Sequence, residues 1–398
     1  MKYWMRVLTK QSMLLLGTLF SSIGSQALVI SIITLMPSAG YSLFHVGLFI
    51  AIGRLTTLTV SLFCSELPNR IKTRLLILWS EIVGIVAAFG ILIAWYEGPR
   101  GVVCLLMFVM LRSAAMSVQN PSRVRLLKEW NDSNQKGQEK AAVWLNKTTQ
   151  GSILISALLS LPMVYFESIE TVVLLDILTY VANGLLIYFL IPDEPVGQTN
   201  STKSRFSQMA RFGLFYSKVP SLARLDLALL IGASGVNTLF VKLAGSQPFV
   251  ATILQMIFGA SVWLTGFIAH SRQVKSLVVS PWWGLAFGMV ALALASEVSW
   301  WMMIGPVALV FASFWVLFHR YSMEIQTRFS LNEIAGVTGA RMVQVNIVVI
   351  LMEMFVGANS SWISASNELF LRAGFFALIA LVVSSRERKA SHGEVVQT

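Results

Sequence analysis

The sequence predicts an all-α integral membrane protein with about twelve transmembrane helices, and three observations support this fold class. Hydrophobic residues make up 56% of the chain and charged residues only 12%, and the mean hydropathy is +0.70. An ordinary soluble domain carries about 25% charged residues, so a soluble globular protein is excluded. The length of 398 residues suits about twelve spans, since each crossing needs roughly 20 apolar residues and a short connector.

Apolar stretches of about the length that crosses a bilayer follow one another along the chain, separated by short polar connectors. The first, from Ser12 to about Met36, is longer than the about 7 to 15 apolar residues of a signal peptide and lacks a small-residue cleavage site, so we expect an uncleaved helix. The spans are expected at about 12–35, 42–64, 75–95, 101–119, 141–163, 170–191, 225–243, 248–269, 279–297, 299–319, 334–357 and 367–385.

The longest polar stretch runs from Pro192 to Arg224 and divides the expected spans into two equal groups. We therefore predict an amino-terminal six-helix bundle over 1–191 and a cytoplasmic linker over 192–224. A carboxyl-terminal six-helix bundle over 225–385 and a cytoplasmic tail over 386–398 would follow.

Lysine and arginine residues lie almost entirely in alternate connectors, and only Arg100 and Lys242 fall in the others. The positive-inside rule places the basic connectors, and with them both termini, in the cytoplasm. We expect a multi-pass protein of the bacterial cytoplasmic (inner) membrane. The net charge of +11 then reflects topology, so the lipid bilayer is the expected partner and no nucleic acid is expected.

The connector after the second span carries the first motif of a known family. It reads Ser65-Glu66-Leu67-Pro68-Asn69-Arg70-Ile71-Lys72-Thr73-Arg74 and resembles the Gly-x-x-x-Asp-Arg-x-Gly-Arg-Arg loop of the major facilitator superfamily. Ser65 stands where that loop has Gly, and Asn69 where it has Asp. The resemblance implies a cytoplasmic gate formed by Asn69, Arg70 and Arg74, in which Asn69 leaves a neutral hydrogen bond in place of an ion pair.

Two further segments resemble the branch of that superfamily that contains bacterial siderophore exporters and macrolide efflux pumps. The first is Gln119-Asn120-Pro121-Ser122-Arg123 with the later Leu145-Asn146-Lys147, and the second is Glu324-Ile325-Gln326-Thr327-Arg328 with Gly336-Val337-Thr338-Gly339-Ala340-Arg341. The Gly-Pro-rich antiporter motif of span five is not evident around Gly151. The resemblance implies two six-helix bundles around a central cavity, which rock between inward-open and outward-open states.

Four basic residues, Arg54, Arg112, Lys147 and Arg341, lie deep within the expected spans. Each is a functional hypothesis, because a charge in the hydrocarbon region costs about 2.5 to 3.5 kcal/mol on insertion scales. The resemblance places their spans around the cavity. Since a guanidinium fork suits carboxylate or phosphate, we predict that these residues bind an anionic small molecule.

Three carboxylates, Glu81, Asp176 and Glu353, lie comparably deep. Proton coupling needs a buried acid and a cation whose approach changes its protonation, so we predict this role for the three acids. Arg112 resembles the span-four arginine that many family members use for proton coupling. The alternative is that the acids pair with the deep cations and only hold helices together, and Glu81 could instead be a partner of the gate arginines.

Most tryptophans of the second half fall at span ends, where aromatic belts lie at the membrane interfaces. Trp263 and Trp315 lie deeper. We predict that they form an apolar wall for a bulky substrate.

The sequence contains no Gly-x-x-x-x-Gly-Lys-Ser/Thr loop, so a secondary gradient is the expected energy source. The dispersed histidines and the isolated Cys64 and Cys104 match no enzyme motif, disulfide framework or metal site, so we expect no enzyme activity and no cofactor.

We therefore predict a monomeric, proton-coupled exporter of an anionic siderophore of the carboxylate type, working by alternating access. A multidrug or macrolide efflux pump of the same fold is an alternative, with a more apolar cavity. A non-transporting membrane receptor or scaffold is a second alternative, which would not need a charged interior. Export rather than uptake rests on the resemblance alone.

Overall fold

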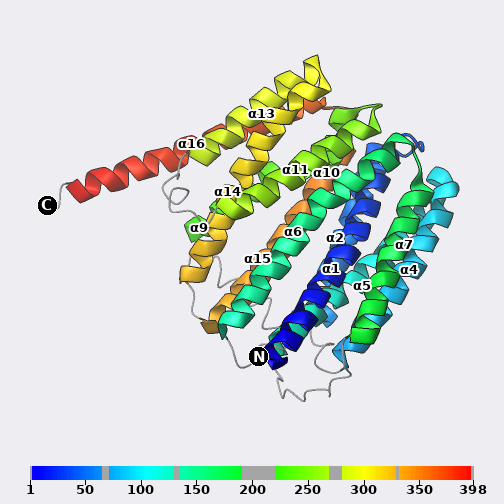
Figure 1. Ribbon diagram of the computed structural model, residues 1–398. Coiled ribbons are helices and arrows are strands. Elements are labelled where there is room, and N and C mark those ends of the chain that lie inside the picture. The colour runs from blue at the N-terminus through cyan, green and yellow to red at the C-terminus, as the bar shows by residue number, and fades with distance from the viewer. Residues whose placement is uncertain are drawn as a thin grey trace.

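The computed structural model describes residues 2–64, 71–129, 135–190, 220–268, 280–328 and 331–395. These residues form helices joined by short turns, and none of them belongs to a β-strand (Figure 1). Among the described residues, eleven helical segments are long and apolar enough to cross a membrane, and Gly151–Tyr165 is a shorter apolar one. The all-α membrane fold class predicted from the sequence is confirmed.

The first half of the described chain is a bundle in which α1 packs against α6 and α7, and α4 packs against α5 and α7. Small residues allow the closest of these contacts. The Ser156 hydroxyl donates a 2.9 Å hydrogen bond to the Ile23 carbonyl, and Ser160 donates a 3.2 Å bond to Ala27, as in helix pairs buried in lipid. The helices are α1 (Lys2–Leu35), α2 (Leu43–Cys64), α4 (Thr73–Tyr96), α5 (Val102–Glu129), α6 (Gln135–Tyr165) and α7 (Ile169–Leu190), with the 3₁₀ turn η1 (Gly98–Gly101) before α5.

The second half is a bundle in which α13 packs against α14 and α16, and α11 packs against α14. Its apolar core surrounds the fully buried Trp282 and Phe376, whose ring centroids lie 6.0 Å apart. The helices are α9 (Pro220–Ala233), α10 (Val236–Ala244), α11 (Pro248–Ile268), α13 (Ser280–Val298), α14 (Ile304–Arg328), α15 (Leu331–Ala358) and α16 (Ala365–Val395), with the 3₁₀ turn η2 (Trp300–Met303) before α14.

Helix ends follow local chemistry. Pro220 and Pro248 are the first residues of α9 and α11, a position where the missing N–H of proline is not needed. α9 therefore starts inside the range predicted as linker, and α16 continues to Val395, through the range predicted as tail. The basic residues after Ser385 are good helix formers, and α16 extends beyond the other helices in Figure 1.

The span predicted at 225–243 is not one continuous helix. It is divided between α9 and α10 at Ser234 and Gly235, and Gly235 has φ +77° and ψ 13°, in the left-handed region. Glycine adopts this conformation without strain, so the break is encoded locally. Hydropathy alone does not reveal it, because both half-helices are apolar.

The two halves meet where α2 packs against α15 and α6 packs against α11. At the end of the molecule that carries the α1–α2 turn, the backbones of α2 and α15 touch. A Cβ atom at Gly357 would lie 2.8 Å from the Leu43 carbonyl oxygen, and one at Gly47 would clash with the Glu353 carbonyl. We call this contact the glycine seam. The positive-inside rule predicts that this end faces the exterior.

Candidate functional site

A cavity of about 440 Å³ lies between the two halves. Its lining comes from α1, α2, α5 and α6 of the first half and from α9, α10, α11, α14 and α15 of the second. Both halves therefore contribute to one chamber, the central cavity. A site shared between two bundles can exchange its contents with either side if the bundles rock.

Arg54 on α2 lines the central cavity, and its side chain is exposed to it. Within the described part of the chain, Arg54 forms no hydrogen bond and no ion pair. Glu353, also at the cavity, attracts it from beyond ion-pair distance. An arginine in this situation keeps its guanidinium fork available for an anion that enters the cavity.

Arg112 on α5 also lines the cavity, but it is buried and already paired. Its Nη2 atom lies 3.2 Å from Oδ2 of Asp176 on α7 and donates a 2.7 Å hydrogen bond to the Ser25 carbonyl. Asp176 is fully buried behind Arg112 and does not line the cavity. The pair thus connects the cavity wall to an acid in the interior of the first half.

Glu81 lies in the interior of the first half, away from the cavity lining. Its carboxylate accepts hydrogen bonds from Gln119 and Asn183, and Nη2 of Arg123 lies 3.5 Å away. Sequence reasoning missed Arg123 as a partner, although Gln119 and Arg123 stand four residues apart in a quoted motif and so share one face of α5. These contacts hold α4, α5 and α7 together.

The gate arginines are only partly described. Arg74 donates a 2.5 Å hydrogen bond to the Tyr188 carbonyl and lies 5.2 Å from the centre of the Tyr188 ring, which ties α4 to α7. Asn69 and Arg70 lie outside the described residues, as does the side chain of Lys147.

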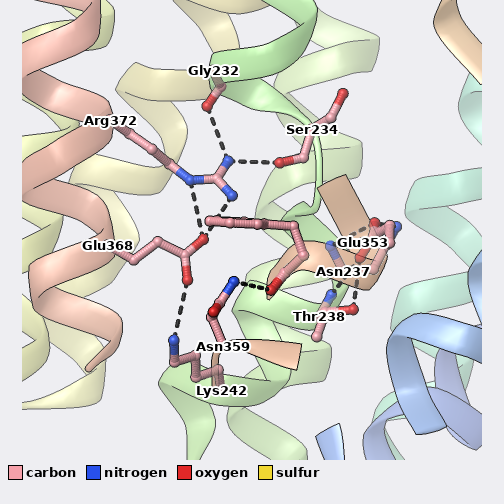
Figure 2. Close-up of polar contacts among 10 residues, drawn as sticks. Gly232, Ser234, Asn237, Thr238, Lys242, Glu353, Asn359, Glu368 and Arg372 are labelled. Atoms are coloured by element: carbon pink, nitrogen blue, oxygen red, sulfur yellow. Dashed lines mark hydrogen bonds and ion pairs between the residues drawn. The ribbon is translucent and has the colours of Figure 1, made fainter. Parts of the chain in front are cut away.

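Glu353 on α15 lies at the break between α9 and α10 (Figure 2). Its carboxylate accepts hydrogen bonds from the Asn237 Nδ2 atom at 2.8 Å, the Thr238 backbone N–H at 3.0 Å and the Thr238 hydroxyl at 2.7 Å. These donors belong to the first turn of α10. An anion is stabilised there by the free N–H groups and the positive end of the helix dipole, so Glu353 caps the half-helix.

A second cluster caps the other side of the break, and sequence reasoning missed it (Figure 2). Arg372 on α16 donates 3.0 and 2.6 Å hydrogen bonds to the carbonyls of Gly232 and Ser234, at the carboxyl-terminal end of α9. Glu368 accepts from Arg372 at 2.7 Å and from Lys242 of α10 at 3.1 Å. The spacing of Glu368 and Arg372, four residues apart in one apolar span, is the signal that could have shown the cluster.

Arg341 on α15 is buried and does not line the cavity. Its Nε and Nη2 atoms bind the two carboxylate oxygens of Asp226 at 2.9 and 2.6 Å. Its guanidinium also lies 4.2 Å from the centre of the Phe318 ring. Asp226 was not among the predicted deep acids, because it stood one residue after the predicted start of its span, whereas α9 begins at Pro220.

The two predicted tryptophans occupy different places. Trp315 on α14 lines the central cavity, and its Nε1 atom is buried without a hydrogen-bond partner among the described residues. Trp263 on α11 is 39% exposed and lies outside the cavity lining, facing Gly151 of α6. Only Trp315 is therefore positioned as a cavity wall.

No protein-family model and no curated protein sequence matches the chain with significance. Solved structures do match it. A mutant of the nucleoside transporter NupG aligns with a TM-score of 0.73 at 11% identity, covering 94% of this chain and 99% of its own. A bacterial homologue of the iron transporter ferroportin, in an inward-facing state, aligns with a TM-score of 0.71 at 11% identity over 95% of this chain and 98% of its own. The chain has the major facilitator fold.

Within this major facilitator fold, the deep charges form two sets. Arg54, Arg112 and Glu353 line the central cavity. The pairs of Glu81 with Arg123 and of Asp226 with Arg341 lie inside the bundles. The first set can meet a solute, and the second holds helices together. The narrower resemblance to siderophore exporters and macrolide pumps stays a prediction.

Proposed function

We propose that the protein is a secondary active transporter that exports a small anionic solute by proton-coupled alternating access. The observation that carries this proposal is Arg54, a cation exposed to the central cavity without an ion-pair partner in the described chain. The predicted solute is a siderophore of the carboxylate type. The likeness to solved transporters supports the transport step and leaves the solute open.

An Arg54 side chain without an ion-pair partner has an unfavourable electrostatic free energy, which a bound anion would lower. A charge in a low-dielectric chamber is stabilised strongly by an anion that forms a bidentate contact, since two charge-assisted hydrogen bonds form at once. Arg112 also lines the cavity and could contribute a second cation to the anion. Lipophilic cations would be repelled by the same two groups.

Proton coupling follows from the pairing of Arg112 with Asp176. A solute anion that approaches Arg112 competes with Asp176 for the guanidinium. An acid that loses its partner cation in a buried position favours the neutral, protonated form. Binding of the anion would therefore promote proton uptake at Asp176, and release of the anion would restore the pair and expel the proton. Glu81 and Glu353 remain further candidates for this role.

Alternating access would use the contact between the bundles. The glycine seam joins α2 and α15 through backbone contacts at the predicted external end. Rocking that separates the seam would open the central cavity to that side. The proposed direction is export, as the resemblance implies.

The test compares Arg54→Gln with the parental protein in cells grown under iron limitation, with solutes in medium and cytoplasm measured by mass spectrometry. Gln keeps a polar donor and removes the charge. Losing a buried charged partner costs about 2 to 5 kcal/mol, so the exported solute should fall by roughly 30-fold or more at unchanged membrane abundance. Arg54→Lys should restore export only partly, because it lacks the fork.

Arg100→Gln is the matched control, because Arg100 is exposed in η1, outside the cavity lining. It should export at the parental rate. Parental export by Arg54→Gln would overturn the anionic-solute proposal.

The aromatic side chains in the cavity support one alternative function, efflux of macrolide-like drugs. Drug efflux predicts that uncharged apolar compounds accumulate in cells lacking the gene and that Arg54→Gln has no effect. A non-transporting receptor or scaffold predicts no change in any solute on either side of the membrane.

A further inference from the structure

We infer that the central cavity selects a planar aromatic anion, with its acidic group on Arg54 and its ring against the aromatic face of α14. This inference rests on the proposed anionic solute, and within that class it favours an aromatic acid over an aliphatic polycarboxylate. Three independent features of the cavity support it.

The first feature is the arrangement of rings on α14. Phe311, Phe314, Trp315 and Phe318 follow one another at helical spacing, and all four line the cavity. Phe314 and Phe318 are stacked with an interplanar angle of 23°, and the Trp315 and Phe318 centroids lie 5.1 Å apart. One helix therefore presents a continuous aromatic face, the α14 wall. Offset-stacked and edge-to-face contacts make such a wall better suited to a ring than to an aliphatic chain.

The second feature is the rigidity of this wall. Behind Phe318 stands the Arg341 guanidinium, 4.2 Å from the ring centre, and Asp226 fixes that guanidinium through two hydrogen bonds. Phe311 packs edge-to-face on Phe258 of α11, with centroids 4.7 Å apart. The rings are therefore held before a solute arrives, which reduces the entropy lost on binding.

The third feature is an unused donor. The Nε1 atom of Trp315 is buried, and in the described part of the chain it has no hydrogen-bond partner. Buried indole N–H groups normally find an acceptor. A hydroxyl, carbonyl or phenolate oxygen on a bound aromatic acid would supply it, while the ring covers the α14 wall.

Together, these features predict that the cavity binds an aromatic acid more tightly than a purely aliphatic polycarboxylate. Both would satisfy Arg54. An aliphatic polycarboxylate would bring hydrated groups against the apolar rings and would leave polar groups without partners there. An aromatic acid, or a chelator built from aromatic acids, meets the cation and the wall at once.

The experiment measures binding to the purified full chain in lipid nanodiscs by titration calorimetry, with three probes of similar size. These are 2-naphthoate, its saturated analogue decahydro-2-naphthoate, and the uncharged 2-naphthamide. We expect 2-naphthoate to bind roughly 2- to 10-fold tighter than the saturated acid, the range that ring contacts contribute. It should also bind at least about 10-fold tighter than the amide, because only the acid pairs with Arg54.

Two variants locate the ring preference. Trp315→Leu should bring the ratio between the aromatic and saturated acids close to one. Trp362→Leu is the matched control, because Trp362 is 86% exposed and lies outside the cavity, so it should keep the parental ratio. If Trp315→Leu does not fold, comparing the three probes on the parental protein still tests the inference.

The outcomes separate the inference from the proposed function. If both acids bind equally and the amide binds weakly, the aromatic inference is wrong and the anionic function stands. If the amide binds as well as 2-naphthoate, the anionic function itself is wrong. Failure of all three probes to bind would overturn the aromatic inference.

Discussion

The cations that line the central cavity in the first half are held differently from the cations buried in the second half. In the first half, Arg54 faces the central cavity without an ion pair among the described residues, and Arg112 pairs with Asp176 and donates one hydrogen bond to the Ser25 carbonyl. In the second half, Arg341 is held by two bonds from Asp226, and Arg372 by Glu368 and two carbonyls.

This difference suggests a division of work. Charges that are satisfied on several sides hold a structure, since breaking them leaves an unpaired buried ion. Arg54, which has no ion-pair partner in the described chain, can accept a solute without breaking an existing contact. The second half needs charges that hold the structure, because α9 and α10 form a broken helix inside the membrane. Backbone N–H and C=O groups without hydrogen-bond partners cost several kcal/mol of free energy there.

The largest expected effect comes from breaking a buried ion pair of the second half. Asp226→Asn leaves Arg341 buried without its carboxylate, and this should lower the free energy of unfolding by about 3 to 5 kcal/mol. Thermal unfolding in detergent measures it. Arg54→Gln is the contrast and should keep or raise the free energy of unfolding, because it removes a cation that has no ion-pair partner in the described chain. The double change Asp226→Asn with Arg341→Gln should recover much of the loss. Equal losses for Asp226→Asn and Arg54→Gln would remove the distinction between the halves.

A smaller effect distinguishes the helix-capping role of Glu353 from the proton-coupling role proposed for Asp176. Glu353→Gln weakens the charge-assisted bonds at the start of α10 and should lower stability by about 1.5 to 3 kcal/mol, while transport keeps its pH dependence. Asp176→Asn should abolish the pH dependence. Transport in proteoliposomes across a series of pH gradients, together with thermal unfolding, distinguishes the two variants. Loss of pH dependence in Glu353→Gln would instead assign the coupling role to the second half.

The smallest effect concerns the break itself. Gly235→Ala should cost about 1 to 2 kcal/mol of stability, because an L-residue is strained in the left-handed region. The added Cβ would also lie 2.9 Å from the Met352 carbonyl oxygen. Gly374→Ala is the matched control, because Gly374 is helical and nothing lies within 4 Å of an added Cβ. That control should stabilise by about 0.5 to 1 kcal/mol. If both variants unfold at the same temperature, Gly235 does not set the break.

Much of the fold could be predicted from the sequence, since apolar length directly reflects bilayer thickness. The expected spans agree with the helices to within a few residues at most ends. The break at Gly235 could not be predicted from hydropathy, which averages over both half-helices. A Ser-Gly pair inside an apolar span was the available signal.

The candidate site was predictable in part. The depth of Arg54, Arg112, Glu353 and Trp315 in their spans singled them out, and all four line the central cavity, although their roles stay proposals. Arg341 was predicted to bind the solute by the same logic, yet it lies in the interior beside Asp226. Depth along a helix does not tell which face a residue occupies, and only helix packing decides that.

The glycine seam has a consequence for turnover. Where Gly47 and Gly357 meet the opposite backbone, neither glycine contributes a side chain, and close backbone approach of this kind allows weak Cα–H···O interactions of about 0.5 to 1 kcal/mol each. Contacts this weak can be broken and remade in every cycle without a deep kinetic trap. A leucine or an ion pair at the same place would close the seam more firmly and slow its opening. The absence of side chains at these two positions therefore suits the opening and closing that the proposed transport cycle requires.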